Sequence, residues 1–119
     1  MKGNKEGKWK MIITRTPFRM SFAGGGSDIA SFYEKHGGCV LSTTLNKYMY
    51  ISVHPSFESM DTVLKYSQTE IVDDIDNIDH KYFKEVLHML RISGVEISST
   101  ADVPAGTGLG SSSSFTVGL

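Results

Sequence analysis

At 119 residues, the chain is long enough for one domain with a hydrophobic core and too short for two. Hydrophobic residues make up 39% and charged residues 21%, with a formal net charge of −1, which is the composition of an ordinary soluble protein and argues against nucleic acid as a partner. No apolar run reaches the roughly 20 residues of a membrane helix. The single cysteine, Cys39, excludes an internal disulfide and fits a reducing compartment. We therefore expect a cytoplasmic protein without a membrane partner.

The first ten residues are expected to form a separate segment. They contain four lysines, and residues 1–10 are predicted to be a basic, solvated and disordered tail. Residues 11–119 are then predicted to form the folded domain.

Short β-type segments dominate the first half of that domain. Residues 11–16 form a β-type run closed by Pro17, and a second run over 18–23 leads into Gly24-Gly25-Gly26, which marks unusual backbone or a close approach. Ser27 or Asp28 is predicted to cap a short helix over 29–35, with Gly37-Gly38 as its stop. Two further strands, 39–45 and 48–54, are predicted to form a hairpin around Asn46-Lys47.

The second half contains the clearest helix. Weaker strand candidates at 62–67 and 70–73 precede residues 79–93, where four apolar residues fall on one helical face: Phe83, Val86, Leu87 and Leu90. Asp79 is the expected cap and Gly94 the stop. A strand over 95–101 follows. This order predicts an α+β fold with a mixed or antiparallel sheet and helices on one face.

A glycine- and serine-rich segment carries the chemistry. Residues 104–114 read Pro-Ala-Gly-Thr-Gly-Leu-Gly-Ser-Ser-Ser-Ser, and from Ser111 the sequence looks like the first turns of a helix. Alternating glycines let several backbone N–H groups converge on one anion, and a helix N-terminus favours phosphate. Serine hydroxyls can donate to phosphate oxygens or reach a metal ion. The segment is therefore a candidate phosphate-binding loop, with a flexible linker or an ordinary turn as alternatives.

Two common phosphate loops are excluded. A Walker A motif needs Gly-Lys-Ser/Thr, and no lysine lies between Val95 and Leu119. A dinucleotide fingerprint needs a third glycine where Ser111 stands. The loop would depend on backbone donors, serines and a cation.

This segment resembles the phosphate loop of the GHMP kinases, Pro-x-x-x-Gly-Leu-Gly-Ser-Ser-Ala, with Ser113 where alanine is commonest. A second motif, Arg-Thr-Pro-Phe-Arg-Met-Ser-Phe-Ala-Gly-Gly-Gly-Ser-Asp at 15–28, resembles the family's N-terminal substrate motif. The resemblance covers about residues 11–119 and implies the N-terminal portion of a GHMP-type kinase domain, incomplete at its C-terminal end.

Gly25-Gly26 stand where galactokinases carry Glu-His, and the pattern is similar to that of bacterial heptose kinases. That similarity implies phosphoryl transfer from ATP, with Mg²⁺, to a sugar or sugar phosphate, foremost a heptose 7-phosphate at its anomeric hydroxyl. A fucokinase-like sugar kinase is the competing branch.

The resemblance also implies roles for matching residues. Arg19 is the catalytic candidate, beside the attacking hydroxyl, and Ser111 and Ser112 are candidate magnesium contacts. The substrate-binding candidates are Arg15, Gly24, Gly25, Gly26, Ser27 and Asp28. The ATP-binding candidates are Pro104, Ala105, Gly106, Thr107, Gly108, Leu109, Gly110, Ser111, Ser112 and Ser113.

Family members place a catalytic aspartate well after the loop, and nothing acidic follows Gly110 here. We therefore expect a fragment of a longer enzyme that is inactive alone. A non-catalytic nucleotide- or sugar-binding module and a poorly folding truncated product remain as alternatives.

Overall fold

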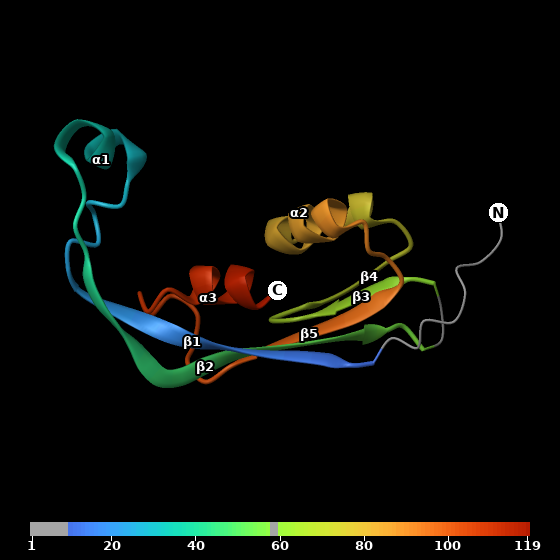
Figure 1. Cartoon of the computed structure of the whole chain (residues 1–119). Helices are drawn as coiled ribbons and strands as arrows, with labels where there is room; N and C mark the ends of the chain where they lie inside the picture. The colour runs from blue at the N-terminus through green and yellow to red at the C-terminus, as the bar shows by residue number, and fades with distance from the viewer. Residues whose placement is uncertain (1–9, 58–59) are drawn as a thin grey trace. The chain divides into compact units, whose positions relative to one another are not determined.

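The computed structural model describes residues 10–57 and 60–119. The predicted tail therefore lies outside the described residues except for Lys10. Five strands form one mixed sheet in the order β1-β2-β5-β3-β4, and helices α1, α2 and α3 complete the described part (Figure 1). The predicted α+β class with a mixed sheet is confirmed. The described part of the chain divides into two compact units, one within residues 1–14, 50–100 and 119 and the other within 15–49 and 101–118.

The first unit is built around a β-hairpin and one helix. β3 (Thr62–Lys65) pairs antiparallel with β4 (Thr69–Val72) and parallel with β5 (Val95–Ala101). A parallel pair needs a crossover connection, and α2 (Lys81–Leu90) lies on it, after the short 3₁₀ helix η1 (Ile75–Asn77). Figure 1 shows α2 lying over β3 and β4. All three strand predictions in this region are confirmed.

Apolar side chains from α2, β3 and β5, together with Ile51 of β2 (Leu41–Pro55) and Ile78 just before α2, make the core of the first unit. They are fully or almost fully buried: Ile51, Leu64, Ile78, Phe83, Leu87, Val95 and Ile97. The apolar stripe predicted for the helix is only partly right, because Leu90 at its end is 50% exposed. Phe83 and Leu87 therefore provide most of the helix's contact with the sheet.

The ends of α2 differ from the prediction. The helix begins at Lys81 with His80 at its N-cap, and no side chain caps it. Asp79 instead donates its backbone N–H to the Glu70 carboxylate at 2.9 Å. Arg91, in left-handed conformation at φ 56°, forms the C-cap, three residues before Gly94. Gly94 turns the chain into β5.

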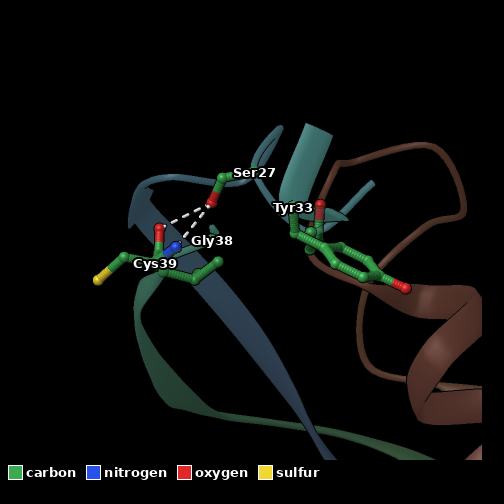
Figure 2. A pocket seen from close by; sticks show the side chains of 6 residues that line it. Ser27, Tyr33, Gly38 and Cys39 are labelled. Carbon is green, nitrogen blue, oxygen red and sulfur yellow. Dashed lines mark hydrogen bonds between the residues drawn. The ribbon is translucent and has the colours of Figure 1, made fainter. Parts of the chain in front are cut away.

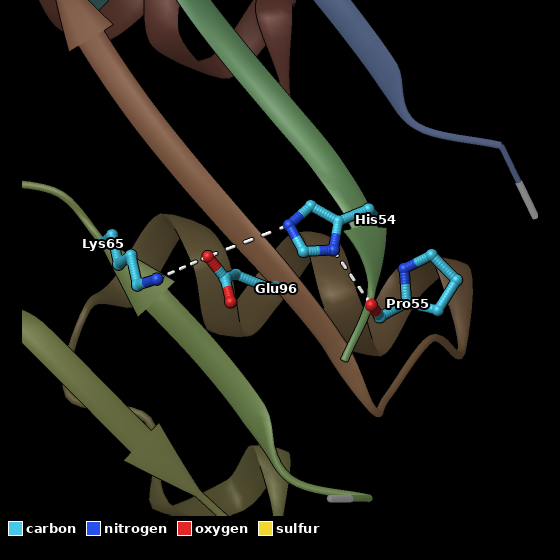
Figure 3. A network of polar contacts seen from close by, with 4 residues as sticks. All are labelled: His54, Pro55, Lys65 and Glu96. Atoms are coloured by element: carbon cyan, nitrogen blue, oxygen red, sulfur yellow. Dashed lines mark hydrogen bonds and ion pairs between the residues drawn. The ribbon is translucent and has the colours of Figure 1, made fainter. Parts of the chain in front are cut away.

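Two carboxylates, those of Glu96 and Glu70, accept side-chain hydrogen bonds at the surface of this unit. Glu96 on β5 accepts a hydrogen bond from Lys65 Nζ at 2.5 Å and lies 3.7 Å from His54 Nε2 (Figure 3). The Lys65 hydrogen bond lowers the pKa of Glu96 below its ordinary value. The hydrogen bond from Tyr66 to Glu70 raises the pKa of the tyrosine hydroxyl to about 12.

The second unit contains β1 (Ile12–Ala23) from Arg15 onward, α1 (Ala30–His36), β2 (Leu41–Pro55) up to Met49, and α3 (Ser111–Gly118). Phe18, Met49 and Phe115 are its buried hydrophobic residues. Figure 1 shows α3 next to β1, and α1 at the turn between β1 and β2.

Two strand predictions in this unit are wrong. Pro17 does not end a strand, because β1 lies at the edge of the sheet, where a residue without an N–H is tolerated. Asn46-Lys47 is not a hairpin turn but part of the 15-residue strand β2. A two-residue type I′ turn needs left-handed backbone, and Arg91 is the one described non-glycine residue with positive φ.

Candidate functional site

The glycine-rich segment forms a tight loop between β5 and α3. Three alternate residues have left-handed backbone: Gly106 at φ 80°, Gly108 at 72° and Gly110 at 72°. A Cβ at Gly106 or Gly108 would meet no atom within 4 Å, so the backbone at these positions borders open space. Glycine is needed here for conformation, and its small size leaves the peptide groups accessible.

The helix predicted after this loop begins at Ser111. Its first N–H groups lack acceptors within the helix by geometry, and Ser112 and Ser113 are exposed. The first amide of this turn with a backbone partner is that of Ser114, which donates to Gly110 at 2.9 Å. The loop and the helix start together present several backbone donors and the positive end of a helix dipole, an arrangement suited to phosphate.

Ser114 has a structural role in this segment. It is only 5% exposed, and its hydroxyl donates to the Pro17 carbonyl at 3.1 Å. This hydrogen bond attaches α3 to β1. The hydroxyl is therefore occupied, whereas the hydroxyls of Ser112 and Ser113 have no hydrogen bond within the described part of the chain.

Arg19 lies directly against the end of the loop. Its backbone N–H donates to Leu109 at 3.2 Å, and its Nη1 donates to Ser21 Oγ at 2.9 Å. A Cβ on Gly110 would lie 3.2 Å from Arg19 Cγ and 3.5 Å from Nε. The two sequence motifs, about 90 residues apart in the chain, thus meet where Arg19 borders Gly110, and they bring a guanidinium beside the start of α3.

The glycine triplet forms a turn packed against the segment before β2. Gly24 has φ 81°, and a Cβ there would lie 1.9 Å from the Cys39 carbonyl oxygen. The Ser27 hydroxyl lies 2.7 Å from the Gly24 carbonyl and 2.9 Å from that of Cys39, and it accepts the Cys39 N–H at 3.1 Å. The unusual backbone expected at the triplet is confirmed at Gly24, and Gly25 and Gly26 lie in the same turn.

This turn borders a pocket of about 450 Å³. Figure 2 shows Ser27 bonded to Cys39 at one side and the Tyr33 ring at another. The lining residues are Ser27, Asp28, Tyr33, Gly38, Cys39 and Val40. One carboxylate and no cation line the pocket, which gives it hydrogen-bond acceptors suited to hydroxyl groups.

The prediction that Ser27 or Asp28 caps α1 is wrong. The N-cap is Ile29, without a side-chain hydrogen bond, and Gly37 at φ 71° ends the helix as expected. The Ser27 hydroxyl is occupied by the turn, which leaves Asp28 as the exposed carboxylate of the pocket wall.

Arg15 has a different partner. Its guanidinium carbon lies 4.4 Å from the centre of the Tyr48 ring, a cation–π contact between β1 and β2. Arg15 does not line the pocket. Arg19 and the loop are therefore brought together, whereas no hydrogen bond or ion pair among the described residues joins Asp28 or Arg15 to them.

The sequence analysis did not select four residues that line the pocket or precede the glycine-rich loop: Tyr33, Cys39, Val40 and Asp102. Asp102 could have been noticed as the last carboxylate before the loop, but the pocket lining depends on the folded turn. Among residues 10–57 and 60–119, no group of three His, Cys, Asp or Glu side chains could hold a metal ion. No helix in that part is long and apolar enough to cross a membrane.

Known protein families and solved structures include relatives of this chain. The family described as GHMP kinases N terminal domain matches residues 78–119, a region that contains α2, β5, the loop and α3. D-glycero-alpha-D-manno-heptose 7-phosphate kinase of Campylobacter jejuni is 31% identical over 124 residues, covering 92% of this chain and 36% of that protein.

Solved structures share the fold. A D-glycero-D-manno-heptose 1-phosphate kinase from Bacteriodes thetaiotaomicron has a TM-score of 0.74 at 24% identity, over 92% of this chain and 39% of its own. The Methanococcus jannaschii mevalonate kinase has a TM-score of 0.68 at 24% identity, over 92% and 38%.

The chain thus spans between a third and two fifths of the length of these relatives. The resemblance predicted from the two motifs is confirmed: the GHMP kinase N-terminal domain family matches residues 78–119, and the fold of most of this chain is shared with the solved kinases.

Proposed function

We propose that this chain is the nucleotide-binding part of an ATP-dependent sugar kinase. The observation that carries the proposal is the junction at Gly110, where a left-handed glycine loop, the start of α3 and the Arg19 side chain meet. Backbone donors, a helix dipole and a fixed positive charge at one place suit a triphosphate. Bound ATP would supply the phosphoryl group for the reaction.

Each part of the site has a role in this proposal. Backbone N–H groups from Ala105 to Ser113 bind the phosphates, and Pro104, which has no N–H, opens the loop. The Ser111 and Ser112 hydroxyls contact phosphate oxygens or the accompanying Mg²⁺. Mg²⁺ prefers oxygen ligands, which serine hydroxyls and phosphate oxygens can supply together. The described residues contain no carboxylate cluster that could bind the ion. Arg19 stabilises negative charge on the attacking oxygen and the transferring group.

The sugar would occupy the pocket beside the glycine triplet. The Asp28 carboxylate can accept two sugar hydroxyls, and Gly24, Gly25 and Gly26 let the sugar lie against backbone. Ser27 holds the turn through Cys39. Arg15 would have to leave the Tyr48 ring to bind a substrate phosphate, so we propose this role only for the loaded enzyme.

We further propose D-glycero-D-manno-heptose 7-phosphate as the substrate and its anomeric hydroxyl as the acceptor. The similarity to a protein with the name of a heptose 7-phosphate kinase supports this choice over a fucokinase-like enzyme. We propose a cytoplasmic location for this enzyme. Residues 11–119 would form the N-terminal portion of its kinase domain. We expect the 119-residue chain alone to turn over little ATP, because no acidic residue follows Asp102 to serve as the base.

Calorimetry with Mg-ATP tests the nucleotide site. Gly108→Val places a β-branched side chain on left-handed backbone at φ 72° in the open space of the loop, so we expect it to abolish ATP binding and leave α2 intact. Gly37→Val is the matched control, because Gly37 has φ 71° and equally open surroundings outside the loop. Equal ATP affinity in the Gly108 variant and the wild type would reject the loop as the site.

ATP turnover on a panel of sugars and sugar phosphates tests the proposed substrate and the proposed inactivity of the chain alone. Phosphorylation of the heptose 7-phosphate by an enzyme carrying this chain, and not by the chain alone, is the expected result. Robust turnover by the isolated chain would contradict the proposed inactivity, and ATP binding without any turnover in the longer protein would indicate a non-catalytic binding module.

A further inference from the structure

Asp102 makes a reciprocal pair of hydrogen bonds just before the glycine loop. Its backbone N–H donates to the Tyr48 carbonyl at 3.0 Å, and its Oδ2 accepts the Tyr48 N–H at 2.8 Å. One residue of β2 is thereby bonded through both of its backbone polar groups. β5 ends at Ala101, so these bonds hold the chain where the sheet no longer does.

The other partner in this pair is itself held in place. Tyr48 is half-buried, its ring lies under the Arg15 guanidinium at 4.4 Å, and the next residue, Met49, is only 8% exposed. Asp102 is therefore attached to an ordered position on β2. Because the Asp102 carboxylate is bonded to this ordered position, the segment that follows Asp102 has less conformational freedom.

The far end of the loop has its own attachments. The Arg19 N–H binds Leu109, and Ser114 binds Pro17. Between the two ends, Gly106 and Gly108 have no neighbour within 4 Å of a Cβ position. A glycine loop with so little packing depends on its ends for order, and a loop that is ordered in advance loses less entropy when it binds a ligand.

We propose that Asp102 is a positioning residue that holds the glycine loop in its phosphate-binding conformation through the Tyr48 N–H. This inference rests on the proposed ATP site and goes beyond it, because Asp102 is assigned no contact with the nucleotide. Its charge opposes an incoming triphosphate, so its benefit lies in the hydrogen bond and not in the charge.

Substitutions separate geometry from charge. Asp102→Asn keeps an acceptor oxygen in place and removes the charge, whereas Asp102→Glu keeps the charge and moves the carboxylate one methylene further. We expect Asp102→Asn to bind Mg-ATP within about threefold of wild type or more tightly, and Asp102→Glu and Asp102→Ala to bind about tenfold more weakly. Glu85→Ala removes a charge from an exposed carboxylate on α2 and should change nothing.

The affinities are measured by calorimetry on the 119-residue chain at constant salt, well below the unfolding temperature. If Asp102→Ala does not fold, the Asn and Glu variants still decide the question. Glu binding like wild type while Asn binds weakly would overturn the proposal, and so would equal affinity in all variants.

Hydrogen exchange of the amides bonded to the loop supplies a readout that needs no nucleotide. The Arg19 N–H donates to Leu109 and the Ser114 N–H to Gly110, so we expect both to exchange faster in Asp102→Glu than in Asp102→Asn, with α2 unchanged in both. Equal exchange in these two variants refutes the positioning role even if ATP binds. A wild-type chain that fails to bind ATP but shows this exchange difference refutes the nucleotide site and leaves Asp102 as an anchor of the loop only.

Discussion

Gly110→Ala tests whether Arg19 and the loop are in direct contact. The residue has φ 72°, where a side chain costs about 1–2 kcal/mol. The new methyl group would also lie 3.2 Å from Arg19 Cγ, closer than ordinary van der Waals contact. The arginine must move by a few tenths of an ångström, and because its side chain is flexible, this adds about 0.5–1 kcal/mol.

Gly106→Ala provides the matched reference. Its φ of 80° gives a similar backbone cost, but a Cβ there meets nothing within 4 Å. We therefore expect Gly110→Ala to lower the free energy of unfolding by about 2 kcal/mol and Gly106→Ala by about 1 kcal/mol. The difference between the two variants measures the contact with Arg19.

Urea unfolding of a double-mutant cycle isolates that contact. Arg19→Ala removes Cγ and Nε, the atoms nearest to the new methyl group, so Gly110→Ala should cost only its backbone strain in that background. Additivity of the two substitutions within about 0.3 kcal/mol, together with equal costs at Gly106 and Gly110, would refute the contact.

Two further predictions concern single polar interactions. Ser114→Ala should lower the free energy of unfolding by about 1–2 kcal/mol, because it leaves the Pro17 carbonyl without the hydroxyl of a nearly buried side chain; a urea titration in which the variant matches wild type would contradict this. Glu96 has a lowered pKa, so its ion pair with Lys65 stabilises the fold above the unfolded-state value of 4.5 and loses this effect as the pH falls through the lower folded-state pKa. At pH 7 the free energy of unfolding of wild type should exceed that of Glu96→Gln by less than about 1 kcal/mol, since Lys65 is half-exposed. This difference should disappear in acid. A difference that grows in unfolding measurements below about pH 4 would refute the stabilising role of the ion pair.

Local patterns predicted what depends on local physics. The helix over α2, the strand β5, the loop and the helix start at Ser111 follow from apolar periodicity, alternating glycines and helix-opening serines. The unusual backbone at Gly24 could likewise be predicted, because three consecutive glycines destabilise the interior of both a strand and a helix.

The errors occur where distant parts of the chain decide the structure. Pro17 lies within a strand because β1 is at the sheet edge, and Asn46-Lys47 stays extended within a single long strand, β2. Ser27 was expected to cap a helix but binds the backbone of Cys39, 12 residues away. A single sequence shows which residues can cap or turn, but not which partner competes for them.

The sequence by itself determined that this chain carries a glycine-rich loop followed by a helix, because backbone dihedrals and helix initiation depend on neighbouring residues. Only the tertiary structure decided that Arg19 borders Gly110 and that Asp102 binds Tyr48, 54 residues away in the chain. These contacts join segments whose proximity is set by strand pairing and burial, and such long-range energies are not encoded in any local pattern.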